Sequence, residues 1–358
     1  MSKRIHNPSG SSPNTGFTLI ELLVAMTISL LLFALALTLA QQLNNTADVV
    51  GSMSDVNENV RAAVNMVSRD LSQAGQNIPV GGIPLPYGGT AKAINRPGPG
   101  SLTYTTTGST LSLPVLTPGY ALGPTQGSGA NAISTDIVTI IGVNQFSGFN
   151  QTAVSGSPTV SSSQATITVS TAAAGFIAPG NLVMLTNANA SCLLAVSSVN
   201  AATGVITFKN NDTTYDLLGV NQFSGPNSGT INQLQTAGNG NWPAIMAYPI
   251  SMTTYYLDTS TPRRLMKEII MGTAQPMALG INVMTITYTC SSTPTPITTR
   301  SPSSPSTIQK VAVTMIGETD HQNHANAQWY SKSITNSVAI QNLDFYNKYS
   351  LGASMTQN

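Results

Sequence analysis

The sequence predicts an α+β fold, in which a long N-terminal helix crosses a membrane and then packs on an antiparallel β-sheet, with a large β-rich insert between them. Three observations predict it. Residues 17–40 form an apolar run with one charge. The spacing of apolar residues then continues as a helix to about residue 75. Short alternating strands, separated by clusters of Gly, Pro, Asn and Ser, fill the remainder.

Charged residues are scarce in this chain. They make up 8% of its 358 residues, against about 25% in an ordinary soluble domain, and the formal net charge is +1. Such a chain has no bulk electrostatic attraction for nucleic acid, so no nucleic-acid partner is expected. A hydrophobic content of 41% also excludes a disordered polar polymer and a protein that spans the membrane many times.

The apolar run over residues 17–40 has one charged residue, Glu21. A helix of this length crosses a hydrocarbon core of about 30 Å. Lys3 and Arg4 precede the run, and no acidic residue lies before Glu21. The positive-inside rule therefore keeps the N-terminus in the cytoplasm and places everything after residue 40 on the other side of the membrane.

Glu21 is the informative residue of this run. A carboxylate in an apolar helix costs about 2.5–3.5 kcal/mol on insertion scales, so such a group is usually paired. If the chain were cut after Gly16, Phe17 would carry a free ammonium group. Residues 17 and 21 lie on one helical face, so that ammonium could neutralise Glu21 in the same chain or in a neighbouring one.

Residues 16–26 read GFTLIELLVAM. This string resembles the cleavage and methylation segment of type IV prepilins and of type II secretion pseudopilins. The resemblance implies that residues 1–16 are a leader peptide and that a prepilin peptidase cuts between Gly16 and Phe17. It also implies N-methylation of Phe17 and assembly with other pilins through the N-terminal helix, for which Glu21 is required. Thr15 stands where the family has Lys or Arg, a departure that bears on the rate of processing.

An ordinary signal peptide is the alternative interpretation of the N-terminus. Residues 34–36 and 38–40 both fit a small-residue cleavage site, and cutting there would leave a chain that starts at Leu37 or Gln41. The apolar run exceeds the about 7–15 residues usual in signal peptides, and a Glu near its start is unusual there. Both facts favour the prepilin interpretation.

The helix is predicted to extend from residue 17 to residue 75. No proline occurs between residues 14 and 78, and beyond residue 40 apolar residues recur in steps of three and four from Val49 to Leu71. Charged residues occupy the opposite face, and Gly75 is expected to end the helix. The closing stretch, residues 69–75, resembles the helix end of the PilW-like minor pilins, which are similar to the J-type pseudopilins.

The remainder is predicted to form a β-rich insert over 76–245, a C-terminal antiparallel sheet of the pilin core over 246–345 and a tail over 346–358. The strands expected in the insert are 111–115, 137–143, 165–169, 182–185, 193–199 and 205–208. Those expected in the C-terminal sheet are 252–257 and 263–270, which form a hairpin, then 281–288, 310–316 and 333–343. The order of these later strands resembles the PilW-like family, with Gln341 in place of an Arg.

The chain has two cysteines, Cys192 and Cys290. The far side of the membrane is an oxidising compartment, so a disulfide between them is predicted, with two buried free thiols as the alternative. Such a disulfide would tie the insert to the C-terminal sheet.

No catalytic motif is present, so the chain is not expected to be an enzyme and no cofactor is expected. His321 and His324 lack a second pair of ligands with zinc-like spacing, and a solvated loop is the preferred interpretation. The oxygen-rich stretch 210–216 lacks the glycine and terminal Glu of a calcium loop, so no metal site is predicted there either.

These observations together predict a minor pilin-type subunit of a type IV pilus. The resemblance implies a position at the tip or a role in priming assembly. The expected location is the bacterial inner membrane, with a single span and the C-terminal domain outside the cytoplasm, followed by the pilus at the cell surface. Three alternatives stay open: a J-type pseudopilin of a type II secretion system, a tip adhesin presented by the insert, and a secreted enzyme.

Overall fold

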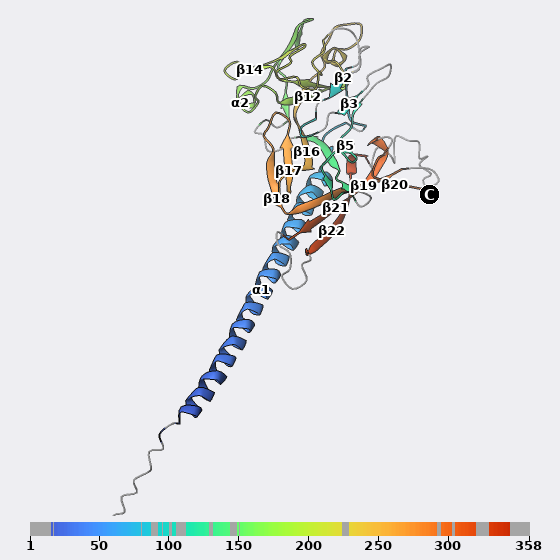
Figure 1. Cartoon of the computed structure of the whole chain (residues 1–358). Coiled ribbons are helices and arrows are strands. Elements are labelled where there is room, and N and C mark those ends of the chain that lie inside the picture. Colours follow the sequence, from blue (N-terminus) through green and yellow to red (C-terminus); the bar gives the residue numbers. More distant parts are fainter. Residues whose placement is uncertain are drawn as a thin grey trace, which may run out of the picture.

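A computed structural model describes residue 16 and residues 18–343, apart from gaps at 80, 87–91, 95, 100–101, 105–111, 129–131, 144–148, 150, 224–228, 292–294, 303–304 and 320–328. The protein consists of one long helix whose N-terminal half projects away from a β-rich domain (Figure 1). The C-terminal half of that helix lies in the domain and contributes to its core. The α+β architecture expected from the sequence, a long helix with antiparallel sheets, is therefore observed.

Helix α1 (Leu19–Ser72) follows the predicted helix over nearly its whole length. Its 54 residues give a length of about 80 Å. Its buried side chains are spaced by three and four residues and form one stripe: Val56, Val60, Ala63, Val64, Val67, Ser68 and Leu71. The helix ends at Ser72, with Gln73 as its C-cap in place of the expected Gly75, which adopts a φ of 74° in the turn that follows.

The largest sheet has eight strands, all paired antiparallel: β5 (Leu116–Gly119), β8 (Ile137–Val143), β9 (Thr152–Ala153), β12 (Leu182–Thr186), β13 (Ser191–Ala195), β16 (Met246–Leu257), β17 (Arg264–Ile269) and β18 (Gln275–Leu279). Strand β16 is central to this sheet: it pairs with β12 and β9 near its start and with β8 and β17 nearer its end. The predicted boundary at residue 245 therefore does not separate two sheets, since strands from both sides of it share this one.

A second sheet has the order β20 (Ile297–Thr299), β19 (Ile281–Cys290), β21 (Ile308–Glu318) and β22 (Ser331–Ala339). Burial alternates along β19 and β21, as expected for antiparallel strands with one face on a core. Helix α1 packs against β21 and β22 of this sheet and against β18 of the larger one. Strand β22 ends at Ala339, and residues 341–343 form a short helical turn where the sequence predicted more strand.

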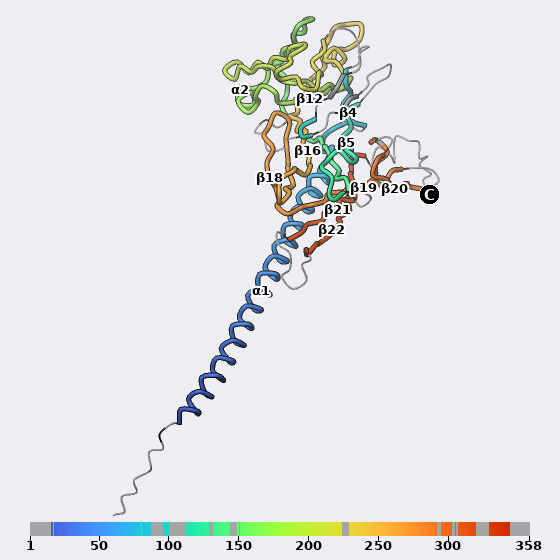
Figure 2. Tube along the Cα trace, viewed as in Figure 1, coloured from blue at the N-terminus to red at the C-terminus, as the bar shows by residue number. Residues whose placement is uncertain are grey.

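The end of the domain farthest from the free half of α1 holds a four-stranded sheet in the order β10 (Thr159–Val160), β11 (Gln164–Thr168), β15 (Val205–Lys209) and β14 (Ser198–Asn200) (Figure 2). The short helix α2 (Thr171–Ala174) follows β11, and the single-turn helix η2 (Ile231–Leu234) packs beside β13. Three two-stranded ribbons complete the described elements: β1 (Ile83–Pro84) with β4 (Ser112–Leu113), β2 (Lys92–Ile94) with β3 (Leu102–Tyr104), and β6 (Thr125–Gln126) with β7 (Ile133–Ser134). A second single-turn helix, η3 (Pro305–Thr307), precedes β21.

The hairpin β12–β13 separates two apolar cores and contributes side chains to both. Alternate side chains of β12 lie on opposite faces. Leu182 and Met184 therefore join the core that contains the α1 stripe. Val183 and Leu185 join a second core, which also contains Ile167, Phe208 and Ile231 and which we call the membrane-distal core. All four of these β12 side chains are at most 1% exposed. The insert is therefore continuous with the core that contains the α1 stripe and is not packed as a separate unit.

The two cysteines lie in different cores. Cys192 belongs to the membrane-distal core and Cys290 to the core that includes α1, and both are buried free thiols. Burial raises the pKa of the Cys192 thiol to about 12, which keeps it protonated and unreactive. The predicted disulfide is therefore corrected, because β13 directs Cys192 to the face opposite the core that holds Cys290.

Gly317 of β21 allows α1 to lie close to the sheet. A Cβ atom at this position would lie 2.5 Å from Val60 Cγ2, 3.2 Å from Val56 Cγ1 and 3.0 Å from the Gly280 carbonyl oxygen. Gly317→Ala is expected to destabilise the domain by about 1–3 kcal/mol through overpacking, measured by thermal unfolding of the full chain in detergent.

Gly51→Ala is the matched control, because Gly51 lies in α1, the helix that packs on Gly317, but has open space around it. This change should leave stability unchanged or raise it by up to about 1 kcal/mol. Equal melting temperatures for the two variants would contradict the close contact between α1 and β21.

Candidate functional site

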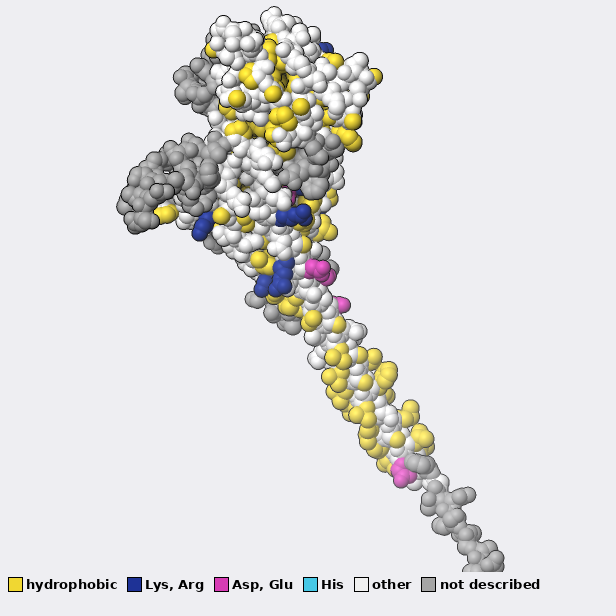
Figure 3. Space-filling model, turned by 180° about the vertical axis from the view of Figure 1, so that it is seen from behind, with side chains coloured by type: hydrophobic (Ala, Val, Ile, Leu, Met, Phe, Trp, Pro, Cys, Tyr) yellow, Lys and Arg dark blue, Asp and Glu magenta, His cyan; other side chains and the backbone are white. Residues whose placement is uncertain are grey.

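The N-terminal half of α1 is apolar and lies outside the domain. Its large apolar side chains from Leu19 to Leu43 are exposed, and none of the residues in its most apolar 18-residue window is buried. They form an almost continuous hydrophobic surface along the free part of the helix (Figure 3). The helix is long and apolar enough to cross a membrane, and its exposure leaves the surface free to contact lipid or other helices.

Two threonines within this span are satisfied by the helix itself. Thr27 Oγ1 donates to the Val24 carbonyl at 2.8 Å, and Thr38 Oγ1 donates to the Ala34 carbonyl at 2.9 Å. These hydroxyls therefore need no water. Glu21 is the only charged side chain between residues 17 and 47 in the sequence, and it is the group whose pairing has to be explained.

Glu21 and Thr18 form a capping box at the start of α1. The Glu21 backbone N–H donates to Thr18 Oγ1 at 3.3 Å, while Glu21 Oε2 accepts from the Thr18 backbone N–H at 3.0 Å and from Thr18 Oγ1 at 2.9 Å. Thr18 was not among the predicted site residues, although Thr-x-x-Glu before an apolar run is the signature of this motif. Both residues lie after the expected cleavage point, so the box is retained if the leader is removed.

The charge of Glu21 has no cationic partner in the part of the chain that the structure describes. Phe17 lies outside the described residues, so its pairing with Glu21 stays a prediction. Gly16 is exposed, and a Cβ atom there would meet nothing within 4 Å. The fold of this chain therefore does not itself require glycine at position 16.

The other half of α1 is fixed to the domain by Asp70. Lys267 Nζ of β17 donates to Asp70 Oδ2 at 2.8 Å, and the Tyr255 hydroxyl of β16 donates to the same oxygen. Burial and the hydrogen bond to Asp70 raise the pKa of Tyr255, so this hydroxyl stays protonated. The contact joins the helix to the largest sheet through a charge-assisted bond.

Asn342 ties the C-terminal segment to the end of α1. Its Nδ2 donates to the Gly75 carbonyl at 3.0 Å and to the Ile78 carbonyl at 2.8 Å. The structure thus brings together residues 69–75 and 338–343, two of the segments in which the chain resembles the PilW-like pilins. Asn342, next to Gln341, was not predicted to make this contact.

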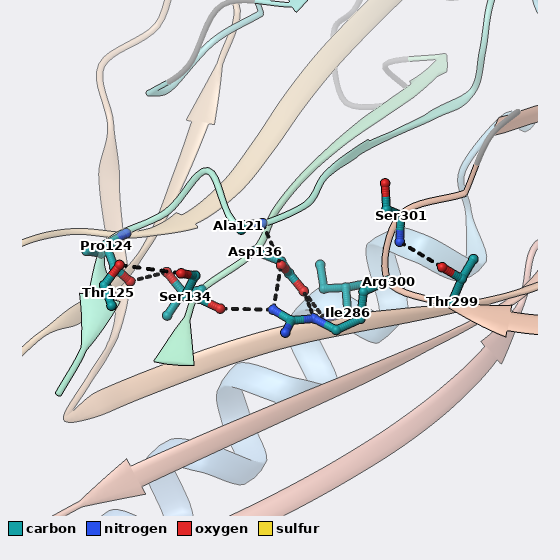
Figure 4. A network of polar contacts seen from close by, with 10 residues as sticks. Ala121, Pro124, Thr125, Ser134, Asp136, Ile286, Thr299, Arg300 and Ser301 are labelled. Carbon is teal, nitrogen blue, oxygen red and sulfur yellow. Dashed lines mark hydrogen bonds and ion pairs between the residues drawn. The ribbon is translucent and has the colours of Figure 1, made fainter. Parts of the chain in front are cut away.

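An ion pair with a buried carboxylate joins the two large sheets (Figure 4). Asp136, which immediately precedes β8, accepts from Arg300 Nη2 at 2.8 Å and Nε at 3.1 Å, and its side chain is 2% exposed. It also accepts from the backbone N–H groups of Ala121 at 2.9 Å and of Ile286 in β19 at 2.7 Å. The hydrogen bonds from Arg300 to Asp136 raise the pKa of the guanidinium further, and Arg300 stacks on the ring of Tyr120.

The considered metal sites are not supported by the described residues. Asp212 accepts from the backbone N–H groups of Thr214 and Tyr215, and Asp216 accepts from those of Val220 and Asn221. These carboxylates hold their own loops. No cluster of His, Cys, Asp or Glu suited to a metal occurs within the described ranges, and His321 and His324 lie outside them.

Comparison with known proteins bears on the N-terminus. Residues 12–37 match the family of the prokaryotic N-terminal methylation motif. No curated protein and no solved structure matches the chain. The match supports a prepilin segment of the type IV pilin kind that includes Gly16, Phe17 and Glu21. The match supports processing by a prepilin peptidase, and the exposed apolar helix is consistent with anchoring in a membrane.

Proposed function

We propose that the chain is a minor pilin-type structural subunit of a type IV pilus and not an enzyme. A prepilin peptidase removes residues 1–16 and methylates Phe17, and the span anchors the protein in the inner membrane with its domain outside the cytoplasm. The chain then leaves the membrane by packing α1 among the helices of other pilins. The observation that carries the proposal is the difference between the two halves of α1. The side chains of its apolar half are exposed, whereas one face of its other half is buried in the core of the domain.

The first turn of α1 supports the assembly step. A carboxylate that lies in lipid without a cation is costly, and Glu21 has no cationic partner among the described residues. An N-terminal ammonium on a neighbouring subunit would neutralise it. The capping box keeps the carboxylate at the first turn, so the charge is held at a fixed height on the helix.

Two features support a minor rather than a major subunit. The contact between Asn342 and the end of α1 joins the segments that resemble PilW-like pilins. The domain also carries a large membrane-distal part with its own core, which is bulky for a subunit repeated at close helical spacing. A position at the tip, or a role in priming assembly, accommodates such a domain.

Gly16→Leu is expected to block cleavage, so that the chain accumulates in the membrane with residues 1–16 attached. The reason is that open space surrounds Gly16 in this chain, which leaves the fit to the peptidase as the source of the glycine requirement. Immunoblotting and intact-mass measurement of membrane fractions check the result. Gly10→Leu, in the same leader, is the control and should be processed normally. Normal processing of Gly16→Leu would contradict the proposal.

Deletion of the gene distinguishes pilus from secretion pseudopilus. The proposal predicts loss or strong reduction of pili in sheared fractions, recovery of the chain from wild-type sheared filaments, and unchanged protein secretion. A secretion defect with normal piliation would replace the pilus role with that of a J-type pseudopilin. Absence of both defects would overturn an assembly function.

A further inference from the structure

A pocket lined by amide side chains lies in the membrane-distal part of the domain. Its walls are the turn between β12 and β13 and the segment that begins at η2, and its volume is about 720 Å³. The side chains that line it include Asn189, Asn232, Gln233, Gln235 and Thr236. Both wall segments lie at the end of the domain opposite the free half of α1 (Figures 1 and 2). We call this the amide pocket.

The amide pocket is polar without being charged. Its remaining lining residues are alanine and glycine, so none of the lining side chains is ionisable. Each Asn or Gln side chain offers one carbonyl acceptor and two N–H donors. A charged ligand would find no counter-ion there, and an apolar ligand would leave these groups unpaired, at a cost for each. The lining therefore fits a neutral ligand with many hydrogen-bonding groups.

Internal hydrogen bonds preform the pocket. Asn189 Nδ2 donates to the Leu234 carbonyl at 3.3 Å and Gln235 Nε2 donates to the Gly240 carbonyl at 2.8 Å, which fixes both walls. Ile231 and Leu234 of η2 are 0% exposed and anchor the second wall in the membrane-distal core. A ligand would not have to order these loops, and that reduces the cost of binding.

These bonds leave a defined set of groups for a ligand. Asn189 Nδ2 donates to two protein acceptors and Gln235 Nε2 to one, so the carbonyl oxygens of both side chains and one N–H of Gln235 are left for a ligand. The Gln233 side chain makes no hydrogen bond with any described residue and presents both its donors and its acceptor. The ligand must therefore both donate and accept at several neighbouring points.

We propose that the amide pocket binds a neutral carbohydrate. Sugars are the uncharged ligands in which nearly every carbon bears a hydroxyl, a group that donates and accepts at once. The volume lies in the range of roughly 300–1,000 Å³ typical of small-ligand sites. This inference goes beyond the proposed assembly function: it gives the membrane-distal end a binding role on whichever filament carries it.

Binding of neutral oligosaccharides to the purified full chain tests the proposal, and it requires no filament. The chain is kept in a sugar-free zwitterionic detergent and applied to an array of oligosaccharides built from glucose, galactose, mannose and N-acetylglucosamine. Sialylated and sulfated oligosaccharides are included on the array. The tightest neutral hit is then titrated by calorimetry. A failure of the assembly proposal would leave this result unaffected.

Three variants make the result specific to the pocket. Gln233→Ala should weaken binding about fivefold to tenfold, as expected for one or two lost hydrogen bonds. Ala237→Arg, at an exposed lining position, should abolish it by filling the pocket. Gln275→Ala changes an exposed Gln of β18 outside the pocket and should have no effect. Unchanged thermal unfolding shows that each variant is folded.

The expected result is saturable binding of a neutral oligosaccharide that Gln233→Ala weakens, Ala237→Arg abolishes and Gln275→Ala leaves unchanged. The proposal is overturned if no neutral oligosaccharide binds at millimolar concentration or if binding survives Ala237→Arg. It is equally overturned if only sialylated or sulfated oligosaccharides bind.

Discussion

Replacing Glu21 with Gln is expected to lower the amount of the chain in sheared filaments by more than about tenfold, while the leader is still removed. Gln at this position can complete the capping box with Thr18, so the helix should begin at the same residue. The change removes only the charge. An N-terminal ammonium would then be left unpaired in apolar surroundings at about 2.5–3.5 kcal/mol, more than the 1.4 kcal/mol of a tenfold change. Immunoblotting of sheared and membrane fractions measures the ratio.

Thr18→Ala separates the cap from the charge. It removes the Thr18 side chain from the capping box but keeps the carboxylate of Glu21, and the loss of a cap costs about 1 kcal/mol. We expect most of this variant to reach the filament. If Glu21→Gln assembled like the wild type, or if Thr18→Ala failed as severely, the role assigned to the charge would be wrong.

Replacing Asp136 with Ala is expected to lower the free energy of unfolding by about 3–5 kcal/mol. Asp136 receives hydrogen bonds from Arg300 and from two backbone N–H groups, and one of these, Ile286, lies in the second sheet. Its removal leaves buried donors without an acceptor and the Arg300 guanidinium without its counter-ion. Denaturant unfolding of the full chain in detergent, followed by tryptophan fluorescence, measures the loss.

Asp258→Ala is the matched control for the buried pair. Asp258 also accepts from an arginine, Arg264 Nε at 2.6 Å, but the Asp258 side chain is 15% exposed against 2% for Asp136, and the pair closes a short turn. Water can replace these bonds, so a cost of about 1 kcal/mol is expected. Similar costs for the two variants would show that Asp136 does not hold the two sheets together.

Local patterns predicted much of the fold. The spacing of Val56, Val60, Val67 and Leu71 gave the buried face of α1, and the apolar alternation at 137–143 gave β8 with both of its ends. The apolar runs in β12 and β13 also carried a signal that was not used. Continuous apolar residues indicate a strand buried on both faces, which is how this hairpin lies between two cores.

Contacts between distant residues could not be predicted in the same way. Asp136 and Arg300 are 164 residues apart, and no local pattern distinguishes them from solvated charges. The predicted disulfide depended on the compartment alone, and the fold places the two cysteines in different cores. The residues of the candidate processing site could be proposed from the sequence because the expected cleavage point, the charge and the apolar run lie in one continuous segment.

The mature N-terminus is the most direct test of the prepilin account. The chain is recovered from the native membrane or from sheared filaments and analysed by mass spectrometry of its N-terminal peptide. The account predicts a chain that begins at N-methylated Phe17, with Thr18 and Glu21 retained. A chain that begins at Leu37 or Gln41 would contradict it, because cleavage by an ordinary signal peptidase would have removed the segment on which anchoring and assembly depend.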